Sequence, residues 1–392
     1  MTCRLKRLIR FGFGIASCLS VLLSPKSGVA APKSIKRPLK VAAVYDVSNR
    51  KLIVKESLNG VELAVRDLVA KGNDVELKTF DSSPSSEGIE KAFNEVVKFG
   101  PDVTIAETDS SRAFIAGEFA EKRGLLMITP TATATRVTDK RVWVFRSNIN
   151  QQIESTTLAS FSVNELKAKR AAILFDPSQV YSSDLAQKFS DEFTKLGGTI
   201  ALKEGVLLSD MTFLPAIQKV RAAQADLLVL PVYEELVAKI VSETIRNGGF
   251  GNTSLLGGNG WATAEIFDEL VLSKSIGSLT AYWFQHFNCQ TITEDMKAFA
   301  AHYKEVYGGK PKTQGSLLGY DTVNLAFRAF KTAGPRATKE QMRDTLRGLN
   351  TFSGLSGKFL FSGHQDPQKS LFMQGIVKGK PNYCRKLDGR NP

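Results

Sequence analysis

From Leu39 onward, the sequence alternates short apolar runs rich in β-branched residues with longer helical patterns. "LKVAAVYD" leads to "ESLNGVELAVRDLVAKG", "VELKTFDSS" leads to "SEGIEKAFNEVVKFG", and "DVTIAE" leads to "SSRAFIAGEFAEKRG". Strands connected through helices in this way pair in parallel, and the helices cover the faces of the sheet. The sequence therefore predicts an α/β fold built on a doubly wound parallel sheet.

The residues at the ends of these helical patterns agree with that prediction. Ser86 and Ser111 stand where a helix needs a side-chain acceptor for its first free N–H groups, so we expect them to be N-caps. Gly72, Gly100 and Gly124 stand where helices end in a left-handed residue.

The same alternation restarts after "VWVFRSN", at about residues 147–151. "AAILFD", "ADLLVLPV" and "TSLLGG" each precede a helical pattern. A chain of 392 residues is long enough for two domains, so we expect two similar Rossmann-like lobes. Near the end, "GKFLFSG" and "SLFMQGIVKGK" predict a closing antiparallel hairpin.

Residues 1–30 have the composition of a signal peptide. "MTCRLKRLIR" carries four cations and no acid, and the apolar run "FGFGIASCLSVLL" behind it is too short to span a bilayer. We predict cleavage after Ala30 and export of the mature chain. As an alternative, "IASC" resembles a lipoprotein box that would anchor the chain through Cys18. No later run reaches the roughly 20 apolar residues of a spanning helix, so we expect no transmembrane segment in the mature chain.

Charge and cysteine content narrow the classes of partner. Five of the cations behind the net charge of +13 lie in residues 1–30, which contain no acid, so the mature chain carries +8. Its remaining Lys and Arg alternate with acids along helices, a pattern typical of solvated faces and not of nucleic-acid binding.

Cys289 and Cys384 remain once the predicted signal peptide is removed. An even pair in an oxidising compartment is compatible with a disulfide, but the spacing leaves their pairing open.

Two clusters of small hydroxyls, "ETDSSR" and "PTATATR", follow two consecutive predicted strands. The carboxyl ends of parallel strands meet at one edge of the sheet, where open α/β sheets bind ligands, so the two loops should be neighbours. Ser110 and Ser111 also precede a helix whose free N–H groups favour an anion. The alternative is that the serines only cap the helix and the threonines bond only one another.

Three polar or aromatic residues stand at corresponding strand ends in the second half of the chain. Tyr181, Tyr233 and Asn259 follow "AILFDPSQV", "DLLVLPV" and "SLLGG". A tyrosine has a flat apolar body and a polar tip, which suits the wall of a partly desolvated cleft. Each tyrosine could instead be a packing residue, but three such residues at equivalent edges favour a cleft.

Catalysis needs a positioned acid, base, nucleophile or metal, and the sequence is poor in these. The three histidines, His286, His302 and His364, lie in unrelated contexts without metal-ligand spacing. "GLSG" at Gly354 is no nucleophile elbow, and no phosphate-binding glycine loop is present. We therefore expect a binding protein with no metal and no cofactor.

These residues resemble the branched-chain amino-acid (leucine/isoleucine/valine) binding protein family, the type I periplasmic solute receptors of ABC importers. The resemblance covers about residues 39–380. It is carried by "DSSRAFIAGEFAEKRGLLMITPTATATRVT", which is similar to the family's serine loop, helix and threonine-rich strand end. "FDPSQVYSSDLA" is similar to its aspartate-tyrosine-glycine segment, with Ser182 in place of the usual glycine.

The resemblance implies two lobes joined by a three-strand hinge, which close like a Venus flytrap around a small-molecule solute. Lobe 1 would comprise residues 39–149 plus 284–353, and lobe 2 residues 150–283 plus 354–388. The protein would be a monomer that delivers its solute to ABC transporter permease subunits; the alternative is a periplasmic sensor that signals to a membrane receptor or regulator.

By position in the family's motif, Ser110 and Thr133 would hold an amino-acid carboxylate with the Thr131 main chain, and Tyr181 and Tyr233 would close the cleft. The family commonly pairs the ligand's ammonium with an acid where this chain has Asn259. Asp109 or Glu107 could supply that charge instead. Otherwise the resemblance implies an amide or a simple carboxylate as the solute.

Overall fold

The computed structural model describes residues 37–49, 51–261 and 277–387. The predicted signal peptide, the alternative lipidation site at Cys18 and the helical pattern expected from residue 263 lie outside these residues.

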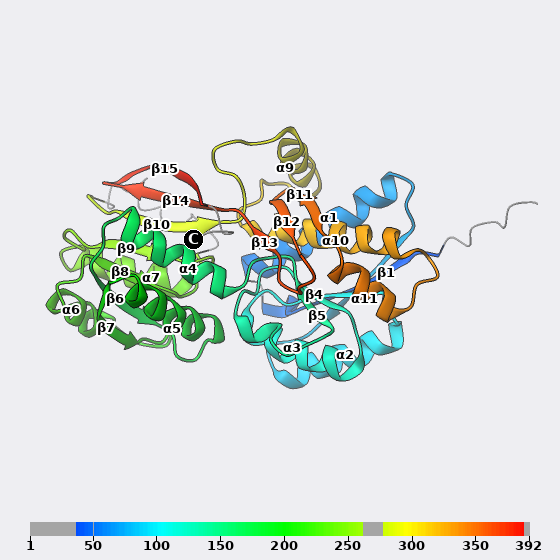
Figure 1. Ribbon diagram of the computed structural model, residues 1–392, viewed down its shortest axis with the longest axis horizontal. Helices are drawn as coiled ribbons and strands as arrows, with labels where there is room; N and C mark the ends of the chain where they lie inside the picture. Colours follow the sequence, from blue (N-terminus) through cyan, green and yellow to red (C-terminus); the bar gives the residue numbers. More distant parts are fainter. Residues whose placement is uncertain (1–36, 50, 262–276, 388–392) are drawn as a thin grey trace, which may run out of the picture. The chain divides into compact units, whose positions relative to one another are not determined.

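The first lobe is built on a five-stranded sheet in which all neighbouring strands are parallel (Figure 1). The strand order is β2-β1-β3-β4-β5. Strand β1 lies inside this sheet and is buried along its length, which is why it reads as a nearly continuous apolar run. The strands are β1 (Leu39–Tyr45), β2 (Val75–Asp81), β3 (Val103–Ala106), β4 (Met127–Thr129) and β5 (Val144–Arg146).

Helices cover both faces of this sheet. Side chains of α1, α10 and α11 pack against one face, and side chains of α2 and α3 pack against the other. Helices α1 and α10 approach each other closely at Gly60, which has no side chain. A Cβ at this position would lie 1.9 Å from the Ser316 carbonyl oxygen. The helices are α1 (Leu52–Ala70), α2 (Ser86–Phe99), α3 (Ser110–Arg123), α10 (Gln314–Ala333) and α11 (Lys339–Arg347).

The second lobe is built on a seven-stranded sheet in the order β15-β14-β10-β9-β8-β6-β7. Its inner pairs are parallel, whereas β14 is antiparallel to both of its neighbours. The strands are β6 (Arg170–Phe175), β7 (Thr199–Gly205), β8 (Leu227–Leu230), β9 (Ser254–Gly257), β10 (Ala281–Gln285), β14 (Leu371–Val377) and β15 (Lys380–Leu387). Its helices are α4 (Gln151–Asn164), α5 (Val180–Lys195), α6 (Leu214–Ala222) and α7 (Glu234–Arg246).

The remaining elements lie between or beside these layers. Helix α9 (Glu294–Tyr307) follows β10, and a small antiparallel sheet has the order β11-β12-β13. Phe359 and Phe361 pack into the core of the first lobe. The small sheet comprises β11 (Thr351–Gly354), β12 (Gly357–Leu360) and β13 (Gln368–Lys369), and two short 3-10 helices span Val47–Asn49 and Thr135–Val137.

Three local predictions need correction. The expected hairpin between "GKFLFSG" and "SLFMQGIVKGK" is wrong, because β14 pairs with β10 and β15, while β12 pairs with β11 and β13. Ser86 and Ser111 are not N-caps: Ser85 caps α2 and Asp109 caps α3, since their side chains accept from the N–H three residues on. Gly100 and Gly124 are left-handed as predicted, and Gly72 also has a positive φ.

The chain passes between the two lobes three times: after β5, after β10 and after β13. Arg146, at the end of β5, binds the loop between β12 and β13, since its guanidinium donates to Asp366 Oδ1 at 2.7 Å. Asn150 donates to the other oxygen of Asp366 at 2.9 Å. Arg146 has no exposed surface and also donates to the carbonyls of Ala132 and Ala134. The predicted lobe boundaries at 149/150, 283/284 and 353/354 stay a prediction.

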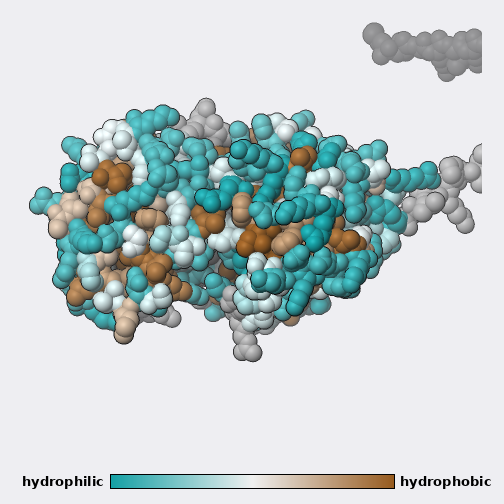
Figure 2. Space-filling view, turned by 90° about the horizontal axis from the view of Figure 1, so that it is seen from below, coloured by the Kyte–Doolittle hydropathy of each residue, from teal (hydrophilic) through white to brown (hydrophobic). Residues whose placement is uncertain are grey.

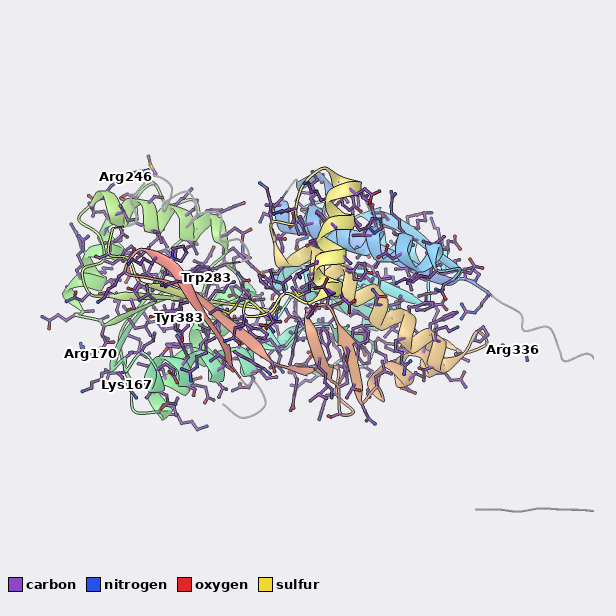
Figure 3. The ribbon with its side chains drawn as sticks, turned by 90° about the horizontal axis from the view of Figure 1, so that it is seen from above. Lys167, Arg170, Arg246, Trp283, Arg336 and Tyr383 are labelled. Carbon is purple, nitrogen blue, oxygen red and sulfur yellow. A yellow bond between two sulfur atoms is a disulfide. The ribbon has the colours of Figure 1, made fainter. Side chains whose placement is uncertain are left out.

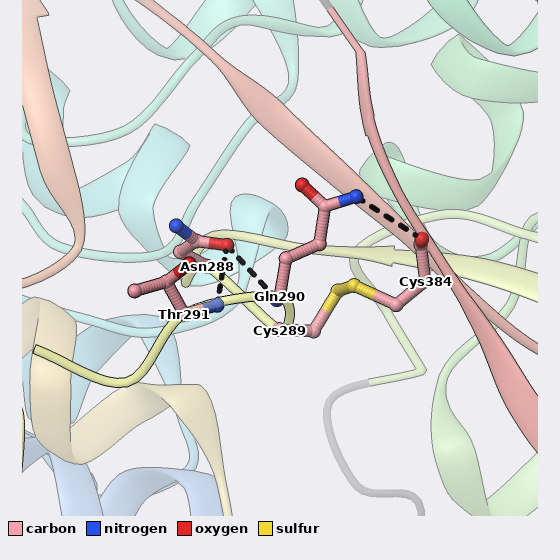
Figure 4. Close-up of a disulfide and its surroundings, with 5 residues drawn as sticks. All are labelled: Asn288, Cys289, Gln290, Thr291 and Cys384. Carbon is pink, nitrogen blue, oxygen red and sulfur yellow. Dashed lines mark hydrogen bonds between the residues drawn. A yellow bond between two sulfur atoms is a disulfide. The ribbon is translucent and has the colours of Figure 1, made fainter.

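A disulfide joins Cys289 to Cys384, with 6.0 Å between their Cα atoms (Figure 4). It connects the segment after β10 to strand β15. Gln290 reinforces the connection by donating to the Cys384 carbonyl at 3.4 Å. This pairing resolves the question that the spacing left open, and it fits an oxidising compartment.

Hydrophilic residues predominate on the face drawn in Figure 2, with hydrophobic residues in small groups between them. In Figure 3, Arg170 and Arg246 lie on the outside of the second lobe, and Arg336 lies at the far end of α10. These three arginines therefore lie on different parts of the surface. Among the described residues, no helix combines the length and the apolar composition that crossing a membrane requires.

Candidate functional site

A cavity of about 540 Å³ lies at the carboxyl ends of the parallel strands of both sheets. Open α/β sheets bind ligands at this edge. Loops that follow β3 and β4 line it from the first lobe, and loops that follow β6, β8 and β9 line it from the second. The two sheet edges therefore contribute to one pocket.

Seven of the eight residues predicted to contact a ligand line this pocket. They are Asp109, Ser110, Thr131, Thr133, Tyr181, Tyr233 and Asn259. Ser111 is not among the lining residues. Its hydroxyl instead accepts from the Val180 N–H at 3.1 Å and donates to Gln179 Oε1 at 3.3 Å, so it links the two lobes beside the pocket.

The two hydroxyl-rich loops of the first lobe contact each other, as their positions in the sequence predict. The Ala134 N–H donates to Ser110 Oγ at 3.1 Å, and the Thr131 hydroxyl donates to the Thr108 carbonyl at 2.6 Å. Ser110 Oγ acts only as an acceptor in that bond, so its own proton can be donated to a bound group.

The two acids of the loop between β3 and α3, Glu107 and Asp109, have different partners. Glu107 is buried and receives two hydrogen bonds from the Arg112 guanidinium, both at 2.9 Å, so it has no free charge for a ligand. Burial nevertheless raises the pKa of Glu107, with Arg112 opposing the shift. Asp109 lines the pocket and accepts from the Arg112 N–H at 2.8 Å, and burial raises its pKa too. Of the two predicted sources of negative charge, only Asp109 faces the pocket.

Two stacked tyrosines form the wall of the second lobe. The Tyr181 and Tyr233 rings lie 5.0 Å apart at an angle of 25°. The Gly260 N–H donates to Tyr181 Oη at 2.9 Å. A Cβ at Gly260 would lie 2.6 Å from the Tyr181 ring, which explains the glycine at this position. Burial raises the pKa of both hydroxyls, so both are neutral donors or acceptors.

Polar groups from the two lobes bond one another across the pocket. The Thr133 hydroxyl donates to Asn259 Oδ1 at 3.4 Å, and Asn259 Nδ2 donates to the Thr131 carbonyl at 3.3 Å. The Ser110 N–H donates to Tyr233 Oη at 3.4 Å. These bonds are longer than the usual 2.7–3.2 Å, so they hold the lobes together weakly. The arrangement is a closed cleft whose polar groups can exchange these bonds for bonds to a solute.

The chain matches the periplasmic binding protein family over residues 38–380. It belongs to this family. Its relatives include "Leu/Ile/Val-binding protein homolog 8" of Brucella suis, 24% identical over 95% of this chain and 94% of the relative. The Leu/Ile/Val-binding protein of Escherichia coli K12 is 25% identical over 54% of this chain and 58% of the relative. The resemblance inferred from the serine loop and the threonine-rich strand end is confirmed.

Solved structures of the family share the fold. A leucine-binding protein of Thermotoga maritima superposes with a TM-score of 0.78 at 23% identity, covering 90% of this chain and 100% of that one. A Rhodopseudomonas palustris solute-binding protein in complex with 4-hydroxybenzoate gives 0.77 at 17% identity, covering 90% and 97%. The two-lobe α/β architecture is confirmed, and the chain is a binding protein of a family that acts outside the cytoplasm.

Several residues that line the pocket of this periplasmic binding protein were not predicted from the sequence. Lys51 and Ile53 border the pocket from the start of α1, and Gln314 reaches it from the start of α10, where its amide donates to the Asn259 carbonyl at 3.1 Å. Leu207 and Leu208 border it after β7. The two leucines stand just after a strand, a signal that could have found them. Gln314 has no such signal, because its helix belongs to a segment far along the chain.

A buried acid lies directly behind this wall. Glu154 Oε1 accepts from the Asn259 N–H at 2.9 Å, and a Cβ at Gly258 would lie 2.2 Å from the same oxygen. Helix α4 carries Glu154 with no exposed surface. The periplasmic binding protein therefore has an amide facing its pocket and a carboxyl group immediately beneath that amide.

Proposed function

We propose that this periplasmic binding protein captures a small carboxylate-bearing solute between its lobes and delivers it to the permease of an ABC importer. The observation that carries the proposal is the single pocket in which Ser110 and Thr133 of one sheet edge face Tyr181, Tyr233 and Asn259 of the other. Such a pocket makes contacts from both lobes at once, and contacts of this kind lower the free energy of the closed form relative to the open one.

The first-lobe side of the pocket supplies donors suited to a carboxylate. The Ser110 N–H at the start of α3 donates to Tyr233 and the Thr133 hydroxyl donates to Asn259, both over 3.4 Å. A carboxylate oxygen would form shorter and stronger charge-assisted bonds with both, and the N-terminus of α3 favours negative charge.

The rest of the pocket suits an apolar body. The two tyrosine rings form one wall, and Ile53, Leu207, Leu208 and Leu236 also border the cavity. Relatives of known structure are in complex with isoleucine, leucine, 3,4-dihydroxybenzoic acid and 4-hydroxybenzoate, each a carboxylate on an apolar body. These ligands support a branched aliphatic or aromatic carboxylate as the solute class here.

Delivery to an importer is the role that the relatives support, since several are named as substrate-binding proteins of ABC transporters. No observation favours the alternative of a periplasmic sensor. The proposal includes a monomeric protein and the lobe boundaries predicted from the sequence.

A thermal-shift screen tests the proposed solute class. The mature protein is heated with leucine, isoleucine, 4-methylpentanoate, 4-hydroxybenzoate and benzamide, the last as a neutral analogue. We expect a rise of several degrees with at least one carboxylate and none with benzamide, because a ligand that binds only the folded state raises its stability by mass action. A rise with benzamide alone would contradict the proposal.

Replacing Asn259 by glutamate should improve the binding of leucine. A carboxylate at this position would face the pocket and pair with the ligand's ammonium, and a charge-assisted hydrogen bond contributes about 1.5–3 kcal/mol, or roughly tenfold to hundredfold in affinity. Calorimetric titration with leucine measures the gain. Asn259→Gln is the matched control, because it lengthens the side chain without adding charge. Equal affinities for both variants would count against the idea that the amide disfavours ammonium ligands.

A further inference from the structure

Glu154 is a carboxyl group with an incomplete set of hydrogen-bond partners beside the solute pocket. Its side chain has no exposed surface, and its Oε1 atom accepts from the Asn259 N–H at 2.9 Å. Within the described part of the chain, its Oε2 atom has no hydrogen-bond partner. An ionised carboxylate buried with a free oxygen is costly, so this group calls for an explanation.

Within the described residues, the groups that act most strongly on Glu154 include no cation. Helix α5 contributes Tyr181 and Asp184, the loop after β9 contributes Asn259, and the first lobe contributes Thr133. Burial raises the pKa of Glu154 to about 8, while the Asn259 N–H and the hydroxyls of Thr133 and Tyr181 oppose this shift. Asp184 raises it further. The group is thus mostly protonated at neutral pH.

Glu154 lies next to two residues that line the pocket, Asn259 and Tyr181. It fixes the backbone of Asn259, whose side chain bonds Thr131 and Thr133 of the opposite lobe. Its Oε1 atom and Tyr181 Oη both crowd the place of a Gly258 Cβ, at 2.2 and 2.5 Å, so the two side chains are close neighbours. The charge state of Glu154 therefore acts on the wall that a solute touches.

We propose that Glu154 is a specificity-determining residue that remains protonated in the closed cleft and so favours carboxylate solutes without an ammonium group beside Asn259. The proposal rests on the proposed function and deepens it. A solute that carries an ammonium group binds best when Glu154 has released its proton to solvent. A solute without one leaves the proton in place.

Leucine and 4-methylpentanoate provide a matched pair of probes, because they differ only by the ammonium group. Their affinities for the wild-type protein are measured by calorimetry between pH 6 and 8.5. The ratio of leucine to 4-methylpentanoate affinity should rise by on the order of tenfold across this range, as Glu154 ionises more readily. In Glu154→Gln, which keeps an acceptor for Asn259 but has no proton to lose, the ratio should be flat. Glu305→Gln, an exposed change on α9, should behave as wild type.

A second measurement needs no ligand. A carboxyl group whose pKa is raised in the folded state holds a proton that the unfolded chain releases. Its burial therefore lowers stability progressively as pH rises from the ordinary glutamate pKa to about 8. Relative to Glu154→Gln, the wild-type protein should lose thermal stability across that range.

The outcomes separate the two proposals. If the wild-type affinity ratio does not change with pH although both probes bind, the role of Glu154 is overturned and the proposed function survives. If no carboxylate binds, the proposed function fails. In that case, parallel pH profiles of thermal stability for wild type and Glu154→Gln overturn the protonated Glu154 as well, and diverging profiles support it.

Discussion

Replacing Arg146 by methionine should destabilise the protein by about 3 kcal/mol, because it leaves the Asp366 carboxylate, whose side chain is only 20% exposed, without its cation. Arg146 is fully buried, and its guanidinium contacts Asp366 at 2.7 Å. It also satisfies the carbonyls of Ala132 and Ala134, which the variant would leave without this donor. Chemical denaturation at neutral pH measures the loss.

The pH dependence of this loss follows from Asp366. Burial alone would raise its pKa, but Arg146, with Asn150 and Thr138, lowers the pKa below its ordinary value. A depressed carboxyl pKa contributes stability above the unfolded pKa and loses it as pH falls through the folded one. The difference between wild type and Arg146→Met should therefore be largest at neutral pH and shrink toward pH 4. The double variant Arg146→Met/Asp366→Asn should recover part of the stability, since neither charge is then buried alone. A constant difference at all pH values would contradict this account.

Replacing both Ser110 and Thr133 by alanine should weaken solute binding by roughly a hundredfold or more without unfolding the protein. Each side chain supplies a hydroxyl for a carboxylate, and a hydrogen bond to a charged group contributes about 1.5–3 kcal/mol. The hydroxyl of Ser110 accepts from Ala134 at 3.1 Å, so we expect a modest loss of stability as well.

Calorimetry with the best-binding carboxylate of the screen measures the change. Thr332→Ala is the control, because this hydroxyl lies on the exposed face of α10 and bonds only the Arg328 carbonyl of its own helix. Unchanged affinity in the double variant would rule out these hydroxyls as the carboxylate site.

Sequence reasoning located the pocket where parallel topology controls position. Ser110 and Thr133 follow consecutive strands joined by one helix, so their convergence depends only on strand order and handedness. The same argument placed Tyr181, Tyr233 and Asn259 at the opposing edge. It could not place Ser111 correctly, because a one-residue step along a helix start turns the side chain toward a different neighbour.

Two features depend on tertiary contacts that leave no periodic signal. Glu154 lies in a helix with many small and polar residues, where an acid usually marks a solvated face; here α5 and the loop after β9 bury it. The predicted pairing of the final strands was wrong because β12 and β14 both read as short apolar runs in the sequence. The sheet that each strand joins depends on which lobe core its side chains enter.

Joining the lobes covalently tests the central claim most directly. The Ser111 hydroxyl of the first lobe donates to Gln179 Oε1 of the second lobe at 3.3 Å. Gln179 lines the pocket, whereas Ser111 lies beside it. Ser111→Cys/Gln179→Cys is oxidised in the absence of solute, with mass spectrometry to verify the new disulfide and each single variant as control. If solute enters through an opening between the lobes, the cross-linked protein should no longer bind the carboxylate that the single variants bind. Full affinity in the cross-linked protein would contradict capture between the lobes.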